Sequence, residues 1–369
     1  MKIYNKSEWK KVKLGDIFIL QMGKTPLREN KLYWDKGNYN WISISDMNFS
    51  EKYISFTKEK ITDFAIKKSG IKIIPKNTVI MSFKLSIGKV KIVNEDIYSN
   101  EAIMAFIPKE DIFIDENFLY HSLKSVRWNE GINKAVKGLT LNKNLISQKE
   151  ILLPNLTIQK EIAKNLDSMG NLLELRKKQL NYLKELGKSL FTRMFGDIKT
   201  NNKNWEINYW KDVLNIKNGK NQKQVEDING KYPIYGSGGI IGRSNAYICN
   251  ENSIIIGRKG NINKPILVKE KFWNVDTAFG LETKRDKISY YYLYYFCLFY
   301  DFEIHNKAVT IPSLVKSDLE KIVLPVPPIE LQNKFAKKIE KITKLSFEIE
   351  EAIKEAENLY NSLISKYFD

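Results

Sequence analysis

Two long stretches of the chain repeat apolar residues at heptad spacing, the pattern of helices that pack against a partner helix. The first stretch runs from Ile162 to Met194, with Arg176 and Gly187 as interruptions. The second runs from Phe335 to Tyr367, and its seam positions lie 173 residues after those of the first. The predicted seam includes Ile162, Leu166, Leu173, Leu180, Leu183, Ile339, Ile342, Ile349, Ile353 and Leu363. This repetition predicts a duplicated unit of one globular part followed by one long helix.

The two helices are expected to pack against each other as an antiparallel coiled coil. A continuous helix over Ile158 to Met194 would be on the order of 55 Å long at 1.5 Å per residue. Antiparallel packing would put one globular part at each end of the helix pair. The pair would then act as a ruler that fixes the distance between the two globular parts. Gly187 on the seam weakens the helix by about 1 kcal/mol relative to alanine. We expect the space beside it to be filled by Tyr360 or Tyr367.

The segments before each long helix mix the periods of strands and helices. Short β-prone runs predict strands at Ile17–Leu20, Tyr39–Ile44, Ile71–Ile74, Thr78–Phe83, Val90–Val93, Ala102–Ile107, Tyr232–Tyr247, Ser253–Ile256 and Pro265–Val268. A helical period follows in each half, at Asp115–Trp128 and Ile288–Phe299. The predicted fold class is α+β, with two mixed α/β domains, two long antiparallel coiled-coil helices that separate them, and an internal two-fold pseudo-repeat.

The order of motifs is the same in both halves. Trp205–Gly219 echoes Trp9–Gly23, and Leu319–Pro325 repeats the strand and proline of Gln148–Pro154. Lys199–Asn204 reads as a flexible polar linker between the halves. We therefore predict a first domain at 1–154, a first helix at 155–198, the linker and second domain at 199–326, and a second helix at 327–369.

The charge of the chain favours a polyanionic partner. Lysine and arginine number 60 against 43 acidic residues, so the net charge is +17. The alternative is that the lysine-rich composition only reflects an AT-rich genome. Cys249 and Cys297 lack metal or redox spacing and are expected to be buried, and two histidines do not make a zinc cluster. The N-terminus has no apolar signal core, which favours a cytoplasmic protein, and Tyr290–Phe299 is too short to span a bilayer.

The sequence contains no constellation that would support catalysis. The Pro-Pro pair within Val326–Ile329 reads as a helix start and not as a methyltransferase motif. The glycine cluster Gly236–Gly242 lacks the spacing of a dinucleotide or phosphate loop and is expected to form a turn between strands. We predict no catalytic residue, no cofactor and no metal site, and no membrane role.

Polar and basic residues in loops beside glycines and strand ends are candidates for DNA contact, because side chains in that setting reach phosphates and base edges. The candidates are Lys24, Thr25, Arg28, Ser43, Lys84, Arg243, Arg258 and Lys259. Each one alone is more often a solvated surface residue. Their recurrence at comparable places in both halves favours double-stranded DNA as the partner.

Nearly the whole chain resembles the specificity subunit of Type I restriction-modification systems. The motifs that carry the resemblance, together with the two long helices, are Gly23–Pro26, Trp41–Asp46, Ser82–Gly88, Tyr232–Ser237 with Gly239–Gly242, Ile256–Gly260, and Leu324–Pro325 with Pro327–Pro328. Their order, twice over, is more specific than any one of them. The first half departs from this pattern at Leu153–Gln159, which is two residues shorter than Leu324–Gln332 and lacks the double proline, so the start of the first helix is the open point.

The resemblance implies two target recognition domains that each read one half of a bipartite DNA sequence. It also implies two helices that dock two methyltransferase (modification) subunits, and restriction subunits in the same complex. In that family, methylation and cleavage belong to the partner chains, so this chain would not itself be an enzyme. Two alternatives remain: a self-sufficient restriction or methylation enzyme, and a coiled-coil structural protein without a nucleic-acid role.

Overall fold

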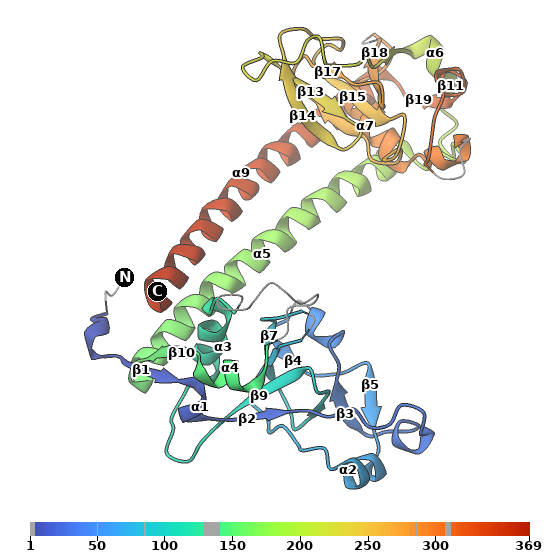
Figure 1. The fold of residues 1–369 in the computed structure, drawn as a ribbon. Coiled ribbons are helices and arrows are strands. Elements are labelled where there is room, and N and C mark those ends of the chain that lie inside the picture. Colours follow the sequence, from blue (N-terminus) through green and yellow to red (C-terminus); the bar gives the residue numbers. More distant parts are fainter. Residues whose placement is uncertain (1–3, 50, 85, 129–140, 285, 307–310) are drawn as a thin grey trace. The chain divides into compact units, whose positions relative to one another are not determined.

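The computed structural model describes residues 4–49, 51–84, 86–128, 141–284, 286–306 and 311–369 (Figure 1). The chain forms two compact units: unit 1 holds Met1–Leu175 with Ile353–Asp369, and unit 2 holds Arg176–Ala352. The predicted motif Ser82–Gly88 contains Leu85, which lies outside the described residues. Within the described part of the chain, we find no helix with the length and hydropathy needed to cross a membrane.

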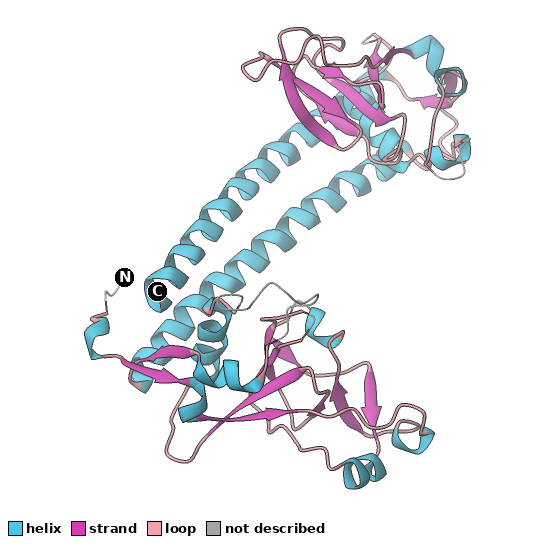
Figure 2. Cartoon of the chain, viewed as in Figure 1, coloured by secondary structure: helices cyan, strands magenta, loops and turns pink. Residues whose placement is uncertain are grey.

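The first globular part belongs to unit 1 and mixes short strands with short helices (Figure 2). Its elements are η1 (Lys6–Glu8), β1 (Lys10–Lys13), α1 (Leu14–Ile17), β2 (Phe18–Met22), η2 (Lys31–Tyr33), β3 (Tyr39–Ile42), η3 (Asp46–Asn48), β4 (Tyr53–Ile54), β5 (Glu59–Ile61), α2 (Asp63–Ser69), β6 (Val79–Ser82), β7 (Val90–Val93), β8 (Tyr98–Ser99), β9 (Ile103–Pro108), α3 (Glu116–Ser125), α4 (Lys143–Gln148) and β10 (Glu150–Leu153).

A five-stranded sheet in the order β2-β9-β6-β7-β4 carries most of the core of this part. A three-stranded sheet, β5-β3-β8, and the pair β1-β10 complete it. The predicted strand at Ile71–Ile74 is wrong, because Ile74 makes only one isolated bridge, with Ile97. Ile71 and Ile74 are buried but Ile73 is 44% exposed, so this run packs its apolar side chains without joining a sheet.

The second globular part belongs to unit 2 and repeats much of this order. Its elements are β11 (Glu206–Tyr209), α6 (Trp210–Val213), β12 (Leu214–Asn218), β13 (Tyr232–Gly236), β14 (Gly239–Ser244), β15 (Ser253–Gly257), β16 (Ile266–Val268), β17 (Trp273–Asn274), β18 (Ala278–Thr283), α7 (Tyr290–Phe299), η4 (Phe302–His305), α8 (Lys316–Leu319) and β19 (Val323–Val326).

The sheets of unit 2 match those of unit 1 strand for strand at their centre. The sheet β12-β18-β15-β16 corresponds to β2-β9-β6-β7, and the pair β11-β19 corresponds to β1-β10. The glycine cluster is confirmed as a turn, since it joins β13 to the antiparallel β14. The helix predicted at Ile288–Phe299 is confirmed as α7, and it is largely buried, with Tyr292 and Leu293 fully enclosed. Both cysteines are buried as expected.

Two helices of 40 residues follow the globular parts: α5 (Leu156–Phe195) and α9 (Ile329–Phe368). Each bound of α9 lies 173 residues after that of α5, so the missing double proline before α5 does not change where the helix starts. All ten predicted seam residues are buried or half-buried. The start of α5 packs against the end of α9 in unit 1, and the end of α5 packs against the start of α9 in unit 2.

One buried glutamine in the first turn of each long helix ties that helix to its globular part. In unit 1, Gln159 Nε2 donates to the carbonyl oxygen of Pro154 at 2.8 Å, and Gln159 Oε1 accepts from the Asp115 amide at 2.9 Å. In unit 2, Gln332 makes the same bonds to Pro327 and Ser289, both at 2.8 Å. Asp115 and Ser289 are the N-cap residues of α3 and α7, so each glutamine sets where a second helix begins.

The contacts between α3 and the long helices in unit 1 combine an apolar cluster around Phe118 with a polar group. His121 Nε2 lies 2.7 Å from Asp167 Oδ1 of α5, and Lys52 Nζ lies 2.6 Å from the same oxygen. The Tyr360 hydroxyl of α9 lies 3.4 Å from His121 Nδ1. Because a carboxylate only accepts, the neutral His121 ring donates from Nε2 and accepts the Tyr360 proton at Nδ1. Burial lowers the pKa of the imidazole, although Asp167 opposes that shift.

The corresponding contacts in unit 2 are aromatic. Phe191 of α5 stacks on Tyr295 and Phe299 of α7, with ring centroids 5.8 and 5.4 Å apart, and meets Phe335 of α9 edge to face. A Cβ atom added at Gly187 would lie 2.1 Å from the Tyr295 hydroxyl oxygen. The expectation that Tyr360 or Tyr367 fills the space beside Gly187 is therefore wrong. Tyr295 fills this space instead, and it belongs to α7 of the globular part and not to the other long helix.

Candidate nucleic-acid interface

One end of the five-stranded sheet in unit 1 gathers the predicted basic residues. Strands β2 and β6 end there and β9 begins there, because Met22 pairs with Met104 and Ser82 pairs with Ile103. Lys24 and Thr25 follow β2, and Lys84 follows β6. The strand register therefore brings together residues that are about 60 positions apart in the sequence.

A turn at Gly23–Lys24, the first glycine–lysine turn, is held by its backbone. The Lys24 amide donates to the carbonyl oxygen of Ser99 at 2.8 Å, and the Trp41 indole donates to the Lys24 carbonyl oxygen at 3.1 Å. A Cβ atom at Gly23 would lie 2.0 Å from the Ser99 carbonyl oxygen, so only glycine fits this approach. The lysine backbone is thereby fixed while its side chain stays exposed, with Nζ 2.5 Å from the Ser69 carbonyl oxygen.

Two acidic side chains accompany the cations at this end of the sheet. Thr25 Oγ1 donates to Glu101 at 2.5 Å, and Arg28 pairs with Glu59 while its guanidinium carbon lies 4.0 Å from the centre of the Trp34 ring. Burial alone would raise the pKa of the Glu101 carboxyl, but the Thr25 hydrogen bond and the charges of Lys84 and Arg28 lower it below its usual value. Glu101 therefore stays ionised among the cations.

Ser43 lies at the same end, directly after β3, since the Asn100 amide bonds the Ile42 carbonyl oxygen. Its amide and its hydroxyl both donate to the carboxylate of the buried Asp46, at 2.8 and 2.7 Å. The Ser43 side chain is thus already used in the structure of its own loop.

Unit 2 builds the same sheet end. Asn218 pairs with Phe279 and Gly257 with Ala278, so β12 and β15 end where β18 begins. Arg258 and Lys259 follow β15 there. Arg258 lies over the Phe279 ring, with its guanidinium carbon 5.9 Å from the ring centre, and Lys259 is exposed.

A second glycine–lysine turn, Gly219–Lys220, lies at this end. The Lys220 amide donates to the Asn274 carbonyl oxygen at 2.9 Å, and the Trp273 indole donates to the Lys220 carbonyl oxygen at 2.9 Å. A Cβ atom at Gly219 would lie 1.8 Å from the carbonyl oxygen of Val275. The two turns thus share one backbone anchor, although the tryptophans come from different strands.

The matching family model carries the description "Type I restriction modification DNA specificity domain", and it matches residues 6–185 and 202–357. The two matches fall on the two halves of the internal repeat and together cover most of the chain. The chain belongs to this family. The predicted resemblance to Type I specificity subunits is therefore confirmed, as is the mixed α+β fold.

One specificity subunit matches most of this chain, and another matches about half of it. The MjaIX specificity subunit of Methanocaldococcus jannaschii is 27% identical over 370 residues, which covers 89% of this chain and 85% of the relative. The EcoR124I/EcoR124II specificity subunit of Escherichia coli is 29% identical over 198 residues, 48% of this chain and 47% of the relative.

Solved structures share the fold over the whole chain. The S subunit of the Type I restriction-modification system from M. genitalium superposes with a TM-score of 0.66 at 19% sequence identity, covering 100% of this chain and 98% of that one. A chain solved in work on complex assembly and conformational transition of the type I R-M system gives a TM-score of 0.61 at 15% identity, with the same coverage. At these identities the likeness concerns the fold alone.

Arg243 is the predicted residue that the structure does not bring to the sheet end of this specificity-family chain. It pairs with Pro233 at the start of β13. Arg258 lies toward the other end of that strand, because its amide bonds the Thr277 carbonyl oxygen and the nearby Val275 amide bonds the Tyr235 carbonyl oxygen. Its guanidinium donates to the carbonyl oxygens of Gly230 and Lys231 at 2.6 and 2.8 Å. Arg243 therefore closes a loop.

Lys220 is the residue that sequence reasoning missed. The match of Trp205–Gly219 to Trp9–Gly23 already contained the signal, because the residue after each matching glycine is a lysine. What the sequence does not show is the indole that anchors each turn, since that indole comes from a strand distant in the chain.

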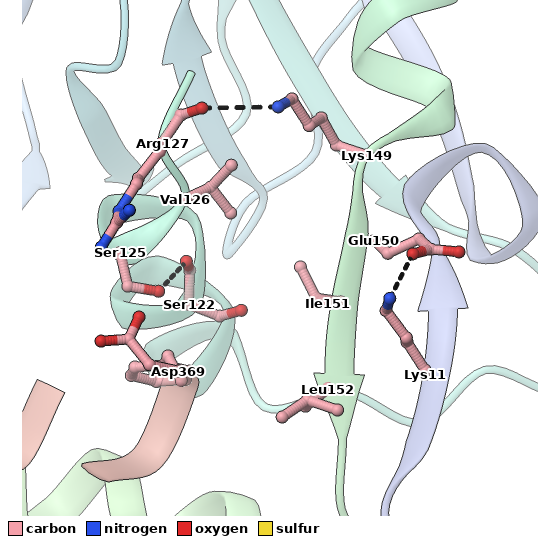
Figure 3. Close-up of a pocket in the computed structure, with 11 residues that line it drawn as sticks. Lys11, Ser122, Ser125, Val126, Arg127, Lys149, Glu150, Ile151, Leu152 and Asp369 are labelled. Carbon is pink, nitrogen blue, oxygen red and sulfur yellow. Dashed lines mark hydrogen bonds and ion pairs between the residues drawn. The ribbon is translucent and has the colours of Figure 1, made fainter. Parts of the chain in front are cut away.

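A cavity of about 570 Å³ lies away from this sheet end, between α3, β10 and the last residues of α9 (Figure 3). Lys149 Nζ reaches the Arg127 carbonyl oxygen at 3.4 Å, and Lys11 pairs with Glu150 at 2.7 Å. Its lysines are thus partnered within the protein. Across the described residues, no group of three or more His, Cys, Asp and Glu side chains is arranged to hold a metal ion.

Proposed function

We propose that this chain is the DNA-reading subunit of a Type I restriction-modification complex, in which each globular part reads one half of a bipartite double-stranded DNA target. The observation that carries the proposal is the repeated sheet end, with its anchored glycine–lysine turn, in a chain of the DNA specificity family. Methylation and cleavage would belong to the modification and restriction subunits, and this chain would be non-catalytic.

The glycine–lysine turns would supply phosphate contacts. A fixed backbone with an exposed lysine positions a charge against the DNA backbone, and such contacts provide affinity and salt dependence without reading sequence. Base contacts in the major groove would come from neighbours such as Arg28 and Arg258, each worth about 1–3 kcal/mol of discrimination. Arg28 is already oriented by Glu59 and the Trp34 ring, so it would reach a base edge with little loss of side-chain entropy.

The charge-removal test compares both ends of the same sheets. Lys24→Ala and Lys220→Ala should each weaken DNA binding by the chain assembled with its modification subunits, and should lower the slope of log affinity against log salt by about 1. Lys109→Ala and Lys284→Ala are the matched controls, because these lysines follow β9 and β18 at the opposite sheet end. Equal losses for the two pairs would refute this interface.

The domain bounds are proposed at 1–154 and 205–326, with the linker at 199–204 and the helices at 155–198 and 327–369. Replacing 205–326 with the segment of a relative should change one half-site and leave the other, as read by mapping methylated bases in DNA modified by the complex. A change in both half-sites would contradict one domain per half-site.

The long helices are proposed to form an antiparallel coiled coil that sets the spacing between the half-sites and docks two modification subunits. Their repeated exposed leucines support a docking face: Leu172 and Leu186 of α5 recur as Leu345 and Leu359 of α9, each at least 42% exposed. Inserting one heptad after Leu180 should change the tolerated spacer and not the bases read. An unchanged spacer would remove the ruler role.

A further inference from the structure

At two positions of the repeat, the second half carries a tyrosine and the first half carries a smaller residue. The first position is the sixth residue of the ten-residue helix of each globular part: His121 in α3 and Tyr295 in α7. The second lies on the long helices, 173 residues apart: Gly187 in α5 and Tyr360 in α9. Each half thus contributes one residue at each of the two positions.

These positions meet in each unit, and always across halves. In unit 1, Tyr360 of the second half reaches His121 of the first half, with the hydroxyl oxygen 3.4 Å from Nδ1. In unit 2, Tyr295 of the second half occupies the space above Gly187 of the first half, and a Cβ atom there would lie 2.1 Å from its hydroxyl oxygen. Both contacts therefore combine a tyrosine of the second half with a smaller residue of the first half. The tyrosine stands on the long helix α9 in unit 1 and on helix α7 of the globular part in unit 2.

The surrounding residues differ in the same sense. Phe299 of α7 stacks on Phe191 of α5 with ring centroids 5.4 Å apart. The corresponding residue of α3 is Ser125, and the corresponding residue of α9 is Ile364, which packs in a cluster with Tyr360 and Phe118. The aromatic pair of unit 2 thus corresponds to two smaller residues in unit 1.

We infer that each half of this chain pairs with the other half and does not pair with a second copy of itself. Two second halves would put Tyr360 where Gly187 stands, so its Cβ would overlap the Tyr295 hydroxyl. Two first halves would put Gly187 opposite His121, which removes the Tyr360 hydroxyl from Nδ1 and leaves a void. The partner that fits each half is the other half, from the same chain or from a second copy, and this holds whether or not the sheet ends read DNA.

The pairing is tested on the full chain cut after folding. A protease site is inserted between the exposed residues Lys199 and Thr200 of the linker. Two cleaved preparations with different tags on the N-terminal half are mixed, unfolded in urea and refolded together. Native mass spectrometry should find only complexes of one N-terminal and one C-terminal half, each with one tag, and none that carries both tags. Complexes of two N-terminal or two C-terminal halves would overturn the inference.

A second test needs no cleavage. Gly187→Tyr should lower the thermal midpoint of the intact chain, and adding Tyr295→His, which transplants the pair of unit 1 into unit 2, should restore most of that loss. Gly170→Tyr is the matched control, because a Cβ atom at Gly170 of the same helix meets nothing within 4 Å. If Gly187→Tyr is tolerated as well as Gly170→Tyr, or if Tyr295→His gives no rescue, size complementarity does not select the partner.

Discussion

The buried glutamines give the sharpest test of how each globular part is attached to its helix. Gln332 is fully buried and makes three hydrogen bonds, to the carbonyl oxygens of Pro327 at 2.8 Å and Lys287 at 3.2 Å and from the Ser289 amide at 2.8 Å. Gln332→Leu keeps most of the side-chain volume and removes all three bonds. The bond to Pro327 is buried and the other two are partly buried, so the expected loss in the free energy of unfolding is roughly 2–5 kcal/mol.

Hydrogen exchange on the intact chain localises this effect. In Gln332→Leu, the amides in the first turn of α7 should lose protection, while those of α3 keep theirs, because Ser289 is the N-cap of α7. Gln159→Leu should show the reverse pattern, since the Asp115 amide that it holds precedes α3. Asn333→Leu, at the exposed neighbouring position, is the control. A Gln332→Leu chain that unfolds at the wild-type urea concentration would refute the reasoning.

Three further predictions concern pH, the glycine–lysine turn and a buried phenol. The depressed pKa of His121 means that its contribution to the stability of unit 1 is present above the ordinary value of 6.5 and is lost as the pH falls from there toward the folded-state value, so urea midpoints should drop on acidification in the wild type and less in His121→Gln. Gly219→Ala should cost about 1–3 kcal/mol because the new Cβ meets a carbonyl oxygen at 1.8 Å, whereas Gly238→Ala, with 3.7 Å of clearance, should unfold like the wild type. Tyr292→Phe should cost about 1–3 kcal/mol, because it strips the buried carbonyl oxygen of Pro325 of its 2.5 Å partner, and equal urea midpoints for Tyr292→Phe and wild type would contradict this.

The heptad period was enough to predict both long helices, because an apolar stripe of that length has few other structures available. The strands in which apolar and polar residues clearly alternate were predicted from that period of two residues. The strand predicted at Ile71–Ile74 was wrong, since a short apolar run next to Pro75 can be buried without joining a sheet. The sequence also showed that Gln159 and Gln332 recur, but not why. Their partners, Asp115 and Ser289, lie more than 40 residues away and are brought in only by the fold.

The candidate site was predictable in outline and not in detail. Basic loop residues could be proposed from their glycine neighbours, and the strand register then separated Arg243 from the rest, which no local pattern could do. The partner of Gly187 was out of reach for a similar reason. A heptad pattern describes contacts between helices, whereas Tyr295 comes from the globular part and enters the seam from the side.

The differences between the halves carry as much information as the repeat. Between β3 and β6 the first globular part holds η3, β4, β5 and α2, whereas between β13 and β15 the second holds only β14, which pairs with β13 as β5 pairs with β3. The first sheet end is bordered by Arg28 and Trp34, from the segment between β2 and β3, and by Glu59 of β5, and the second by the glycine turn that follows β13. The common parts are backbone anchors, which suit contacts to the uniform phosphate backbone, and the differing parts are side chains, which suit contacts to bases. If both sheet ends read DNA as proposed, this division predicts two half-sites of unlike sequence.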